Sequence, residues 1–292
     1  MGTFTHSRLL GSVLIRIAGA TFSFGDLTIE QATVVVDELG FDLVDVGAGW
    51  SNYHQILPQE AVDDPDGQAD RLRRVLDAHQ LAVSELFIMH FGHPINHPAA
   101  QIREWTRGMF EGITHFAQKS GFESVMMIPG HVHEEEGQSA QEAFDLSVEE
   151  LRFMVDVAQQ RELQCNVEPC IGSIAEQPAD AIRLIDAVPG LGLTVDYAHQ
   201  VQLGLGPEQI EPLHPHARHF HAKQSSPESF QARPDEGVID FPRLMRKLDA
   251  DDYAGVVCVE FVTQEPLLEA GWDFKTETAR LKQILDEALA TL

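Results

Sequence analysis

The sequence predicts an α/β protein with a single (β/α)8 barrel domain over residues 1–292. Four short apolar runs in the second half of the chain each end in a polar side chain, at Glu168, Asp196, His221 and Glu260. Consecutive members of this set are 28, 25 and 39 residues apart. A (β/α)8 barrel of ~250 residues uses ~31 residues for each of its eight βα units, so the spacing fits consecutive units. Apolar runs and helical patterns also alternate along the rest of the chain, which favours a parallel sheet with crossover helices.

Length and composition agree with one large domain. The chain has 292 residues, a length that a single barrel domain can have. A hydrophobic fraction of 43% and a charged fraction of 23% are ordinary for a globular protein and supply a large core.

The first half of the chain supplies four strands and their helices. The apolar run at residues 9–18 predicts the first strand, and Thr28 and Gly40 mark the start and stop of the helix that follows. Residues 59–70 are rich in turn formers and carboxylates, so we expect a loop there. Further strands are predicted at 42–50, 82–90 and 123–133, and helices at 70–81, at 101–120 and up to about residue 161.

The second half repeats the pattern more regularly. Strands are predicted at 164–168, at 191–199, up to residue 223 and at 255–262. Helices are predicted from Pro178, around 207–214, from Asp240 and from Asp273. The strands number eight, as barrel closure requires.

Charge and cysteine content limit the partners and the compartment. The net charge of −26, from 46 acidic and 20 basic residues, repels phosphate backbones and anionic lipids, so we expect neither nucleic acid nor membrane as a partner. The chain has three cysteines without CxxC spacing, Cys165, Cys170 and Cys258. This odd number indicates neither a disulfide framework nor a structural zinc cluster, which favours a reduced, cytoplasmic setting. The apolar segment at residues 9–20 is short and interrupted by Arg16, unlike a signal peptide or membrane span.

The four polar strand ends predict a metal site. At the carboxyl ends of consecutive barrel strands, Glu168, Asp196, His221 and Glu260 would meet at one mouth. Each alone is explained by a capped turn or a surface charge, but together they form a hard, oxygen-rich set. Such a set suits Mn²⁺, Mg²⁺ or Co²⁺, with Zn²⁺ left open. A divalent ion there would polarise a sugar carbonyl and stabilise an enediolate, while carboxylates move protons at the adjacent carbon.

Other polar residues near strand ends are candidates for substrate contact. Lys223 lies two residues past His221 and so points the same way in an extended strand, toward the substrate or into a rim ion pair. His131 follows the fourth strand and is the candidate catalytic histidine, while His90 ends the third and is a candidate substrate ligand. His93, His97 and His133 lie further along the sequence from the strand ends, and their roles stay open.

Several motifs resemble a known family. NVEP, TVDYAH, HFHAK followed by PDEGVIDF, and VEF resemble the xylose-isomerase-like TIM barrels, a superfamily of sugar isomerases and epimerases that includes the endonuclease IV branch, AP endonuclease family 2. The resemblance covers essentially the whole chain, although its specific motifs lie in the C-terminal half. It implies that the metal ligands are Glu168, Asp196, His221 and Glu260, with Mn²⁺ as the expected ion.

The same resemblance implies further roles. Glu168 and Glu260 would form the proton-transfer pair of the epimerases, His199 would contact substrate or a second metal, and Arg233 would bind substrate. The loop RPDEGVIDF lacks the histidine of the Asp-x-His pair that the endonuclease branch carries after strand seven, so a trinuclear site is incomplete. Barrels of this family commonly oligomerise, which implies an oligomer or a partner subunit.

Three functional hypotheses follow. The first is a divalent-metal-dependent isomerase or epimerase that acts on a sugar, keto-sugar or polyol acid by proton transfer through a metal-stabilised enediolate. The second is a metal-dependent lyase of the inosose dehydratase, dehydroshikimate dehydratase or C-glycoside deglycosidase type, with His131 or His133 as the leaving-group acid. The third is a barrel that only binds sugar. The absence of an evident Gly-rich anion loop after strands seven and eight favours an unphosphorylated substrate.

Overall fold

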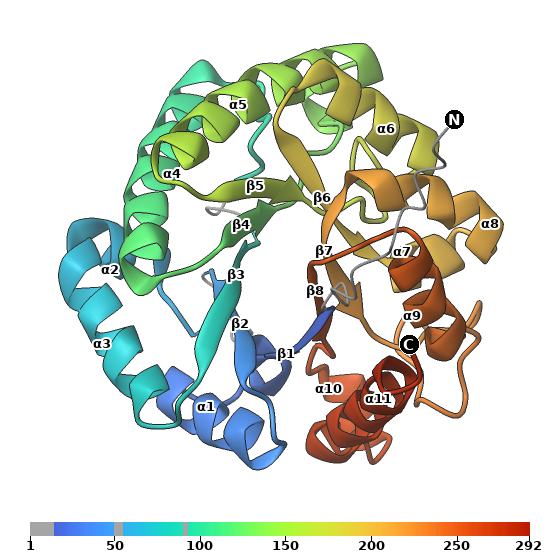
Figure 1. Cartoon of the computed structure of the whole chain (residues 1–292). Coiled ribbons are helices and arrows are strands. Elements are labelled where there is room, and N and C mark those ends of the chain that lie inside the picture. Colours follow the sequence, from blue (N-terminus) through green and yellow to red (C-terminus); the bar gives the residue numbers. More distant parts are fainter. Residues whose placement is uncertain (1–14, 50–54, 90–92) are drawn as a thin grey trace, which may run out of the picture.

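The computed structural model describes residues 15–49, 55–89 and 93–292. These residues form a closed barrel of eight parallel strands in sequential order, surrounded by helices (Figure 1). The predicted fold class is therefore confirmed. The strands are β1 (Arg16–Ala20), β2 (Leu43–Ala48), β3 (Ala82–Ile88), β4 (Ser124–Met127), β5 (Gln164–Val167), β6 (Leu191–Asp196), β7 (Ala217–Ala222) and β8 (Val256–Val259).

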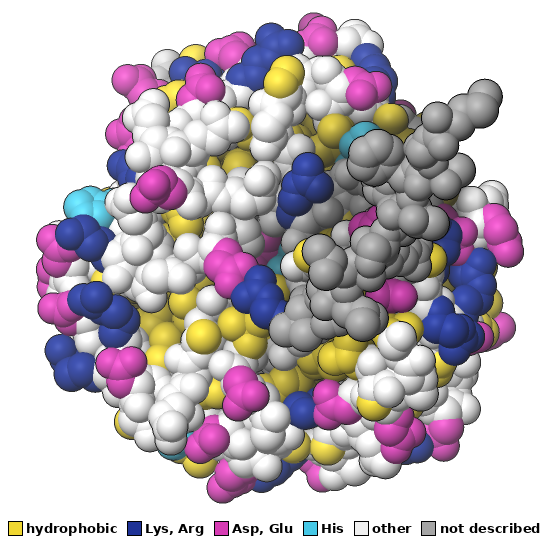
Figure 2. Space-filling view, viewed as in Figure 1, with side chains coloured by type: hydrophobic (Ala, Val, Ile, Leu, Met, Phe, Trp, Pro, Cys, Tyr) yellow, Lys and Arg dark blue, Asp and Glu magenta, His cyan; other side chains and the backbone are white. Residues whose placement is uncertain are grey.

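The helices form the outer layer. They are α1 (Ile29–Glu38), α2 (Pro58–Asp63), α3 (Pro65–Asp77), α4 (Ala100–Ser120), α5 (Ala140–Gln160), α6 (Pro178–Ala187), α7 (Tyr197–Gln202), α8 (Pro207–Ile210), α9 (Phe241–Ala250), α10 (Glu265–Glu269) and α11 (Phe274–Leu289), with 3-10 turns η1 (Thr21–Phe24), η2 (Glu134–Glu136) and η3 (Glu211–His216). Within the described ranges, even the 21-residue helices α4 and α5 lack an apolar stretch that could cross a membrane. Figure 2 shows acidic and basic side chains interspersed over one face of the molecule.

Helix starts agree with the capping residues read from the sequence. The Thr28 side chain accepts a hydrogen bond from the Gln31 amide, and the Gln31 side chain accepts one from the Thr28 amide. Asp240 and Asp273 cap α9 and α11 in the same way. Just beyond the end of α1, Gly40 has a φ of +75°, a conformation that favours glycine.

The predicted loop at residues 59–70 is wrong, because most of it lies in α2 and α3. Pro58 and Pro65 occupy the first position of each helix, where the missing amide proton costs nothing. The Asp64 carboxylate caps α3 by accepting from the Gly67 amide at 3.1 Å. The prolines and carboxylates that suggested turns therefore start helices.

Several strand ends differ from the predicted ends, and β8, for example, stops at Val259 rather than at residue 262. β1 extends to Ala20, and residues 9–14 of the predicted first strand lie outside the described residues. β6 stops at Asp196 rather than at residue 199, because the Asp196 carboxylate accepts from the Ala198 amide and starts α7. β4 stops at Met127, which leaves His131 in the loop beyond it.

Side chains alternate between the barrel interior and the layer under the helices, as the two-residue period of a strand requires. On β8, Cys258 packs with residues of the barrel interior such as Ala18 and Met126, whereas Val257 and Val259 pack with the helix layer. Glu260 has the inward parity of Cys258. The same holds for the other three strands: each polar residue lies two positions after an inward-facing one, namely Glu168 after Asn166, Asp196 after Thr194 and His221 after His219. The strand pattern therefore brings all four side chains to the carboxyl end of the barrel.

An ion pair between neighbouring helices holds the β4–β5 side of the barrel. The Glu150 side chain of α5 is fully buried and accepts from Arg103 Nε at 3.0 Å and Arg107 Nε at 2.7 Å, both in α4. Exposed Glu149 contacts Arg107 as well, at 2.8 Å. Removal of Glu150 would leave both guanidinium groups without their buried partner.

We predict that Glu150→Ala lowers the free energy of unfolding by about 2–3 kcal/mol. This is less than the ~3–5 kcal/mol of a fully buried pair, because the Arg107 side chain is 33% exposed. Glu149→Ala is the matched control and should change stability by less than ~1 kcal/mol. Urea unfolding of the three proteins measures both values, and equal effects of the two substitutions would contradict this role for Glu150.

Candidate metal centre

The inward-facing residues at the carboxyl ends of β5 to β8 form a buried cluster. Glu168 directly follows β5, Asp196 ends β6, His221 is near the end of β7 and Glu260 directly follows β8. All four side chains are buried. His221 Nδ1 lies 3.1 Å from Glu168 Oε1 and 3.4 Å from Glu260 Oε2. The predicted ligand set is thus brought together.

Lys223 and His199 complete this cluster. Lys223 Nζ lies 2.5 Å from both Asp196 Oδ2 and Glu260 Oε2. His199, in the first turn of α7, places Nε2 at 3.7 Å from Glu168 Oε2 and at 3.8 Å from Asp196 Oδ2. The His199 ring also lies 4.7 Å from the Phe230 ring. Both residues therefore lie beside the carboxylates, and their contact with substrate stays a prediction.

The charges of the cluster move its pKa values in different directions. Burial alone would raise the pKa of Glu168, but the hydrogen bond with His221 and the charge of His199 lower it to about 2. Burial raises the pKa of Glu260, despite the cations Lys223 and His221. Burial alone would lower the pKa of His221 and of Lys223, but the surrounding carboxylates raise both. The two glutamates therefore have different proton affinities.

A second polar layer lies within the barrel beside His221, and the sequence analysis missed it. Asp45 Oδ2 of β2 lies 2.7 Å from His219 Nε2 and 3.7 Å from His221 Nε2. Glu85 of β3 accepts from Ser124 at 2.8 Å, Asn166 at 2.7 Å and Thr194 at 2.8 Å. The available signal was an acidic residue in the middle of each apolar strand, in LVDVGA and AVSELFI.

Three groups among the described residues have donor atoms within 4.8 Å of one another and fit a divalent ion. They are Asp45, Glu85, His219 and His221; Glu168, Asp196 and His199; and Glu168, His221 and Glu260. Among the buried atoms of these groups, His221 Nε2 has no hydrogen-bond partner, and Asp196 Oδ2 pairs with the Lys223 ammonium group at 2.5 Å. Carboxylate and imidazole donors of this kind bind divalent metals.

Two further candidates, Arg233 and His131, have other contacts among the described residues. The contacts shown for the Arg233 side chain are to Glu236 at 3.4 Å, Glu277 at 3.6 Å and the Trp272 ring. His90 lies outside the described residues. Nothing in the contacts of the described residues joins either Arg233 or His131 to the carboxylates.

His131 belongs instead to a row of imidazoles beyond β3 and β4. Ring centroids are 5.7 Å apart between His93 and His97, 5.1 Å between His97 and His133, and 4.7 Å between His133 and His131. Burial and the neighbouring imidazoles lower the pKa of His133. The ring planes of these pairs are 78°, 58° and 39° apart, so the row consists of one edge-to-face and two tilted ring contacts.

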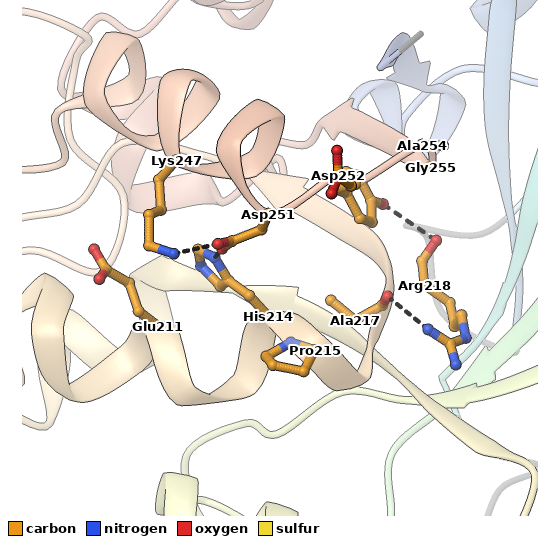
Figure 3. A pocket seen from close by; sticks show the side chains of 11 residues that line it. Glu211, His214, Pro215, Ala217, Arg218, Lys247, Asp251, Asp252, Ala254 and Gly255 are labelled. Atoms are coloured by element: carbon orange, nitrogen blue, oxygen red, sulfur yellow. Dashed lines mark hydrogen bonds and ion pairs between the residues drawn. The ribbon is translucent and has the colours of Figure 1, made fainter. Parts of the chain in front are cut away.

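A hollow of about 510 Å³ lies elsewhere on the barrel (Figure 3). Its lining includes Ala217, the first residue of β7, and Gly255, which precedes β8, so it is at the amino ends of the strands. Beside the hollow, the His214 ring lies between two partners. Its Nε2 is 2.8 Å from the Tyr197 hydroxyl, and its Nδ1 is 3.0 Å from the Asp251 carboxylate. Barrel enzymes react at the opposite, carboxyl end, so we place no catalytic role in this hollow.

The inner layer generates a stability prediction. We predict that Asp45→Asn lowers the free energy of unfolding by about 3–5 kcal/mol, because it removes the buried charge that faces His219 and His221. Exposed Asp42, three residues earlier, provides the control variant Asp42→Asn, which should unfold like the wild type. An Asp45→Asn protein within ~1 kcal/mol of the wild type in urea unfolding would show that this charge is unimportant.

Comparisons with known proteins agree with this architecture. The family model described as xylose isomerase-like TIM barrel matches residues 34–284. No curated protein matches the chain. Among solved structures, a D-psicose 3-epimerase with D-tagatose from Clostridium cellulolyticum H10 is similar, with a TM-score of 0.78 and 12% identity over 94% of this chain and 99% of that one.

Two further structures are similar. A probable 3-DHS dehydratase involved in petrobactin synthesis from Bacillus anthracis has a TM-score of 0.71 and 15% identity over 92% of this chain and 99% of that one. A xylose isomerase-like TIM barrel protein from Mycobacterium smegmatis in complex with magnesium has a TM-score of 0.68 and 20% identity over 96% of this chain and 100% of that one. At these identities the likeness shows the fold alone. The family match, which covers most of the sequence, shows that the chain belongs to the xylose isomerase-like TIM barrel family.

Proposed function

We propose that the protein is a divalent-metal-dependent isomerase or epimerase of a small sugar or keto-sugar. The observation that carries this proposal is the convergence of Glu168, Asp196, His221 and Glu260 at the carboxyl ends of β5 to β8. Barrel enzymes place their chemistry at this end. The epimerase among the similar structures is consistent with the proposed reaction class.

The mouth carboxylates are better placed to hold the ion than the inner layer. Glu85 already accepts three side-chain hydrogen bonds, and Asp45 accepts from His219 and from the Glu85 amide. An ion there would have to replace these bonds. At the mouth, Asp196 Oδ2 forms one close ion pair, with the Lys223 ammonium group at 2.5 Å, and lies 3.8 Å from His199 Nε2. We therefore propose Glu168, Asp196, His221 and Glu260 as ligands, with Mn²⁺ as the preferred ion and Mg²⁺, Co²⁺ or Zn²⁺ as alternatives.

When bound, the ion would polarise the substrate carbonyl and stabilise negative charge on its oxygen. Glu168 and Glu260 would then exchange the proton at the adjacent carbon, one acting as base and the other as acid. His199, beside Glu168 and Asp196, and Lys223 would hold substrate hydroxyl groups.

Two buried aromatic rings lie near His221. The rings of Phe22 and Phe87 are 6.3 Å and 6.2 Å from the His221 ring. Apolar rings beside charged groups limit water there, which strengthens the electrostatic interactions of the carboxylates. A small neutral sugar fits this arrangement, and the acidic mouth disfavours a phosphorylated one.

A metal-dependent lyase is the second candidate, because the same proton abstraction can expel a neighbouring substituent. The dehydratase among the similar structures favours this alternative. A lyase needs an acid over the leaving group, and His131 is the candidate for that role, as it is for a catalytic acid in the isomerase. For this role the His131 ring, which is tilted against the His133 ring at 4.7 Å, would have to turn toward the substrate.

We predict that Glu168→Gln and Glu260→Gln each reduce turnover at least 1,000-fold without loss of the fold, because amides cannot accept the substrate proton. Proton NMR in D₂O with ketoses, inososes and 3-oxo-glycosides measures the reaction: exchange with epimer or isomer formation indicates an isomerase, and a new alkene or released aglycone indicates a lyase. Exposed Glu111→Gln is the control. Full activity in either active-site variant would contradict the proton-transfer assignment.

We also predict that removal of divalent metal with EDTA abolishes turnover and that Mn²⁺ restores it. The physical reason is that the carboxylates alone leave the carbonyl unpolarised. Elemental analysis must confirm that the treated protein is metal-free. Unchanged activity in such a protein would exclude the metal mechanism.

A further inference from the structure

Lys223 occupies an unusual position for a lysine. Its side chain is 2% exposed, and its Nζ lies 2.5 Å from Asp196 Oδ2 and 2.5 Å from Glu260 Oε2. The chain contains five lysines, and the side chains of the other four, which lie on α4, α9 and α11, are all more exposed. Lys223 alone among them balances buried carboxylates of the barrel mouth.

The ammonium position is also the position that a metal ion would need. Divalent ions bind carboxylate oxygens at ~2.0–2.6 Å, and the same two oxygens already lie 2.5 Å from Nζ. An ion bound to Asp196 and Glu260 together would therefore overlap the ammonium group. Two cations cannot share this position.

The two groups of possible ligands at the mouth also indicate that a metal ion and Lys223 Nζ compete for one position. Glu168 joins Asp196 and His199 in one group of donors within 4.8 Å and joins His221 and Glu260 in another. Asp196 and Glu260 share neither group, and Lys223 Nζ lies between them. The lysine thus separates the two halves of the proposed ligand set.

We propose that Lys223 is a displaceable internal cation, which neutralises Asp196 and Glu260 until a divalent ion takes its place and drives the ammonium group toward the substrate. The flexible four-carbon stem allows this movement. The Phe230 ring lies 5.0 Å from Nζ and also contacts His199, so an aromatic face is available to the displaced charge. Metal binding would thereby present a hydrogen-bond donor to a sugar oxygen. This inference rests on the metal site of the proposed function.

Isothermal titration of EDTA-stripped protein with Mn²⁺ at one fixed pH tests the proposal. Lys223→Met removes the competing cation at nearly constant length, so we expect Mn²⁺ to bind at least tenfold more tightly than to the wild type. Lys282→Met on α11 is the control, since Lys282 pairs with Asp286 and lies over Phe41 rather than at the mouth, and its affinity should match the wild type. Equal or weaker binding to Lys223→Met would overturn the proposal. Failure of every protein, wild type included, to bind Mn²⁺ would instead overturn the proposed metal site.

A second measurement needs no substitution at the site. Protein labelled with ¹³C at the lysine ε-carbons should give five signals, and titration with Mg²⁺ should shift one of them, that of the buried lysine, as the ammonium group leaves Asp196 and Glu260. The four signals of exposed lysines should stay constant. If all five stay constant at Mg²⁺ saturation, Lys223 does not move and the proposal is wrong, even where Lys223→Met fails to fold.

Discussion

Burial of carboxylates inside one barrel is the constraint on which this structure depends. Five acidic side chains point into the barrel or its mouth, and all are buried: Asp45, Glu85, Glu168, Asp196 and Glu260. Each buried charge is costly unless it is paired or hydrogen-bonded. β7 and the residue that follows it supply partners for four of them, because His219, His221 and Lys223 share one face, whereas Glu85 accepts from side chains of β4, β5 and β6. His219 faces Asp45, His221 faces Glu168 and Glu260, and Lys223 faces Asp196 and Glu260.

The two polar layers are linked through His221. Its Nδ1 faces the mouth carboxylates, while Nε2 lies 3.7 Å from Asp45 Oδ2 of the inner layer. At this distance the Asp45 carboxylate makes an electrostatic contact with the His221 ring rather than a hydrogen bond. The inner layer, with Glu85 hydrogen-bonded across β4, β5 and β6, therefore supports the mouth as well as the barrel.

The unequal roles of the two chain halves follow from this arrangement. β5 to β8 provide the mouth carboxylates, His221 and Lys223, whereas β2 and β3 provide Asp45 and Glu85 from below. The histidines beyond β3 and β4 contact one another in a row, and none of these ring contacts reaches the carboxylates. In the proposed reaction, proton transfer belongs to the glutamates that follow β5 and β8, and Asp45 and Glu85 of the N-terminal half support them.

The sequence by itself determined the barrel, its eight strands and the convergence of Glu168, Asp196, His221 and Glu260, because strand parity and unit spacing are local, periodic properties. It also placed Lys223 on the correct face. Residues 59–70 were misjudged because proline and aspartate serve turns and helix starts equally, and only the packing of Val62 against Gly112 of α4 distinguishes them. Asp45, Glu85 and His219 went unrecognised as a network, since their pairing joins residues 174 positions apart. Only the closed barrel decided that Lys223 Nζ lies between Asp196 and Glu260, because such contacts across β6, β7 and β8 depend on the register of strands that the linear pattern does not encode.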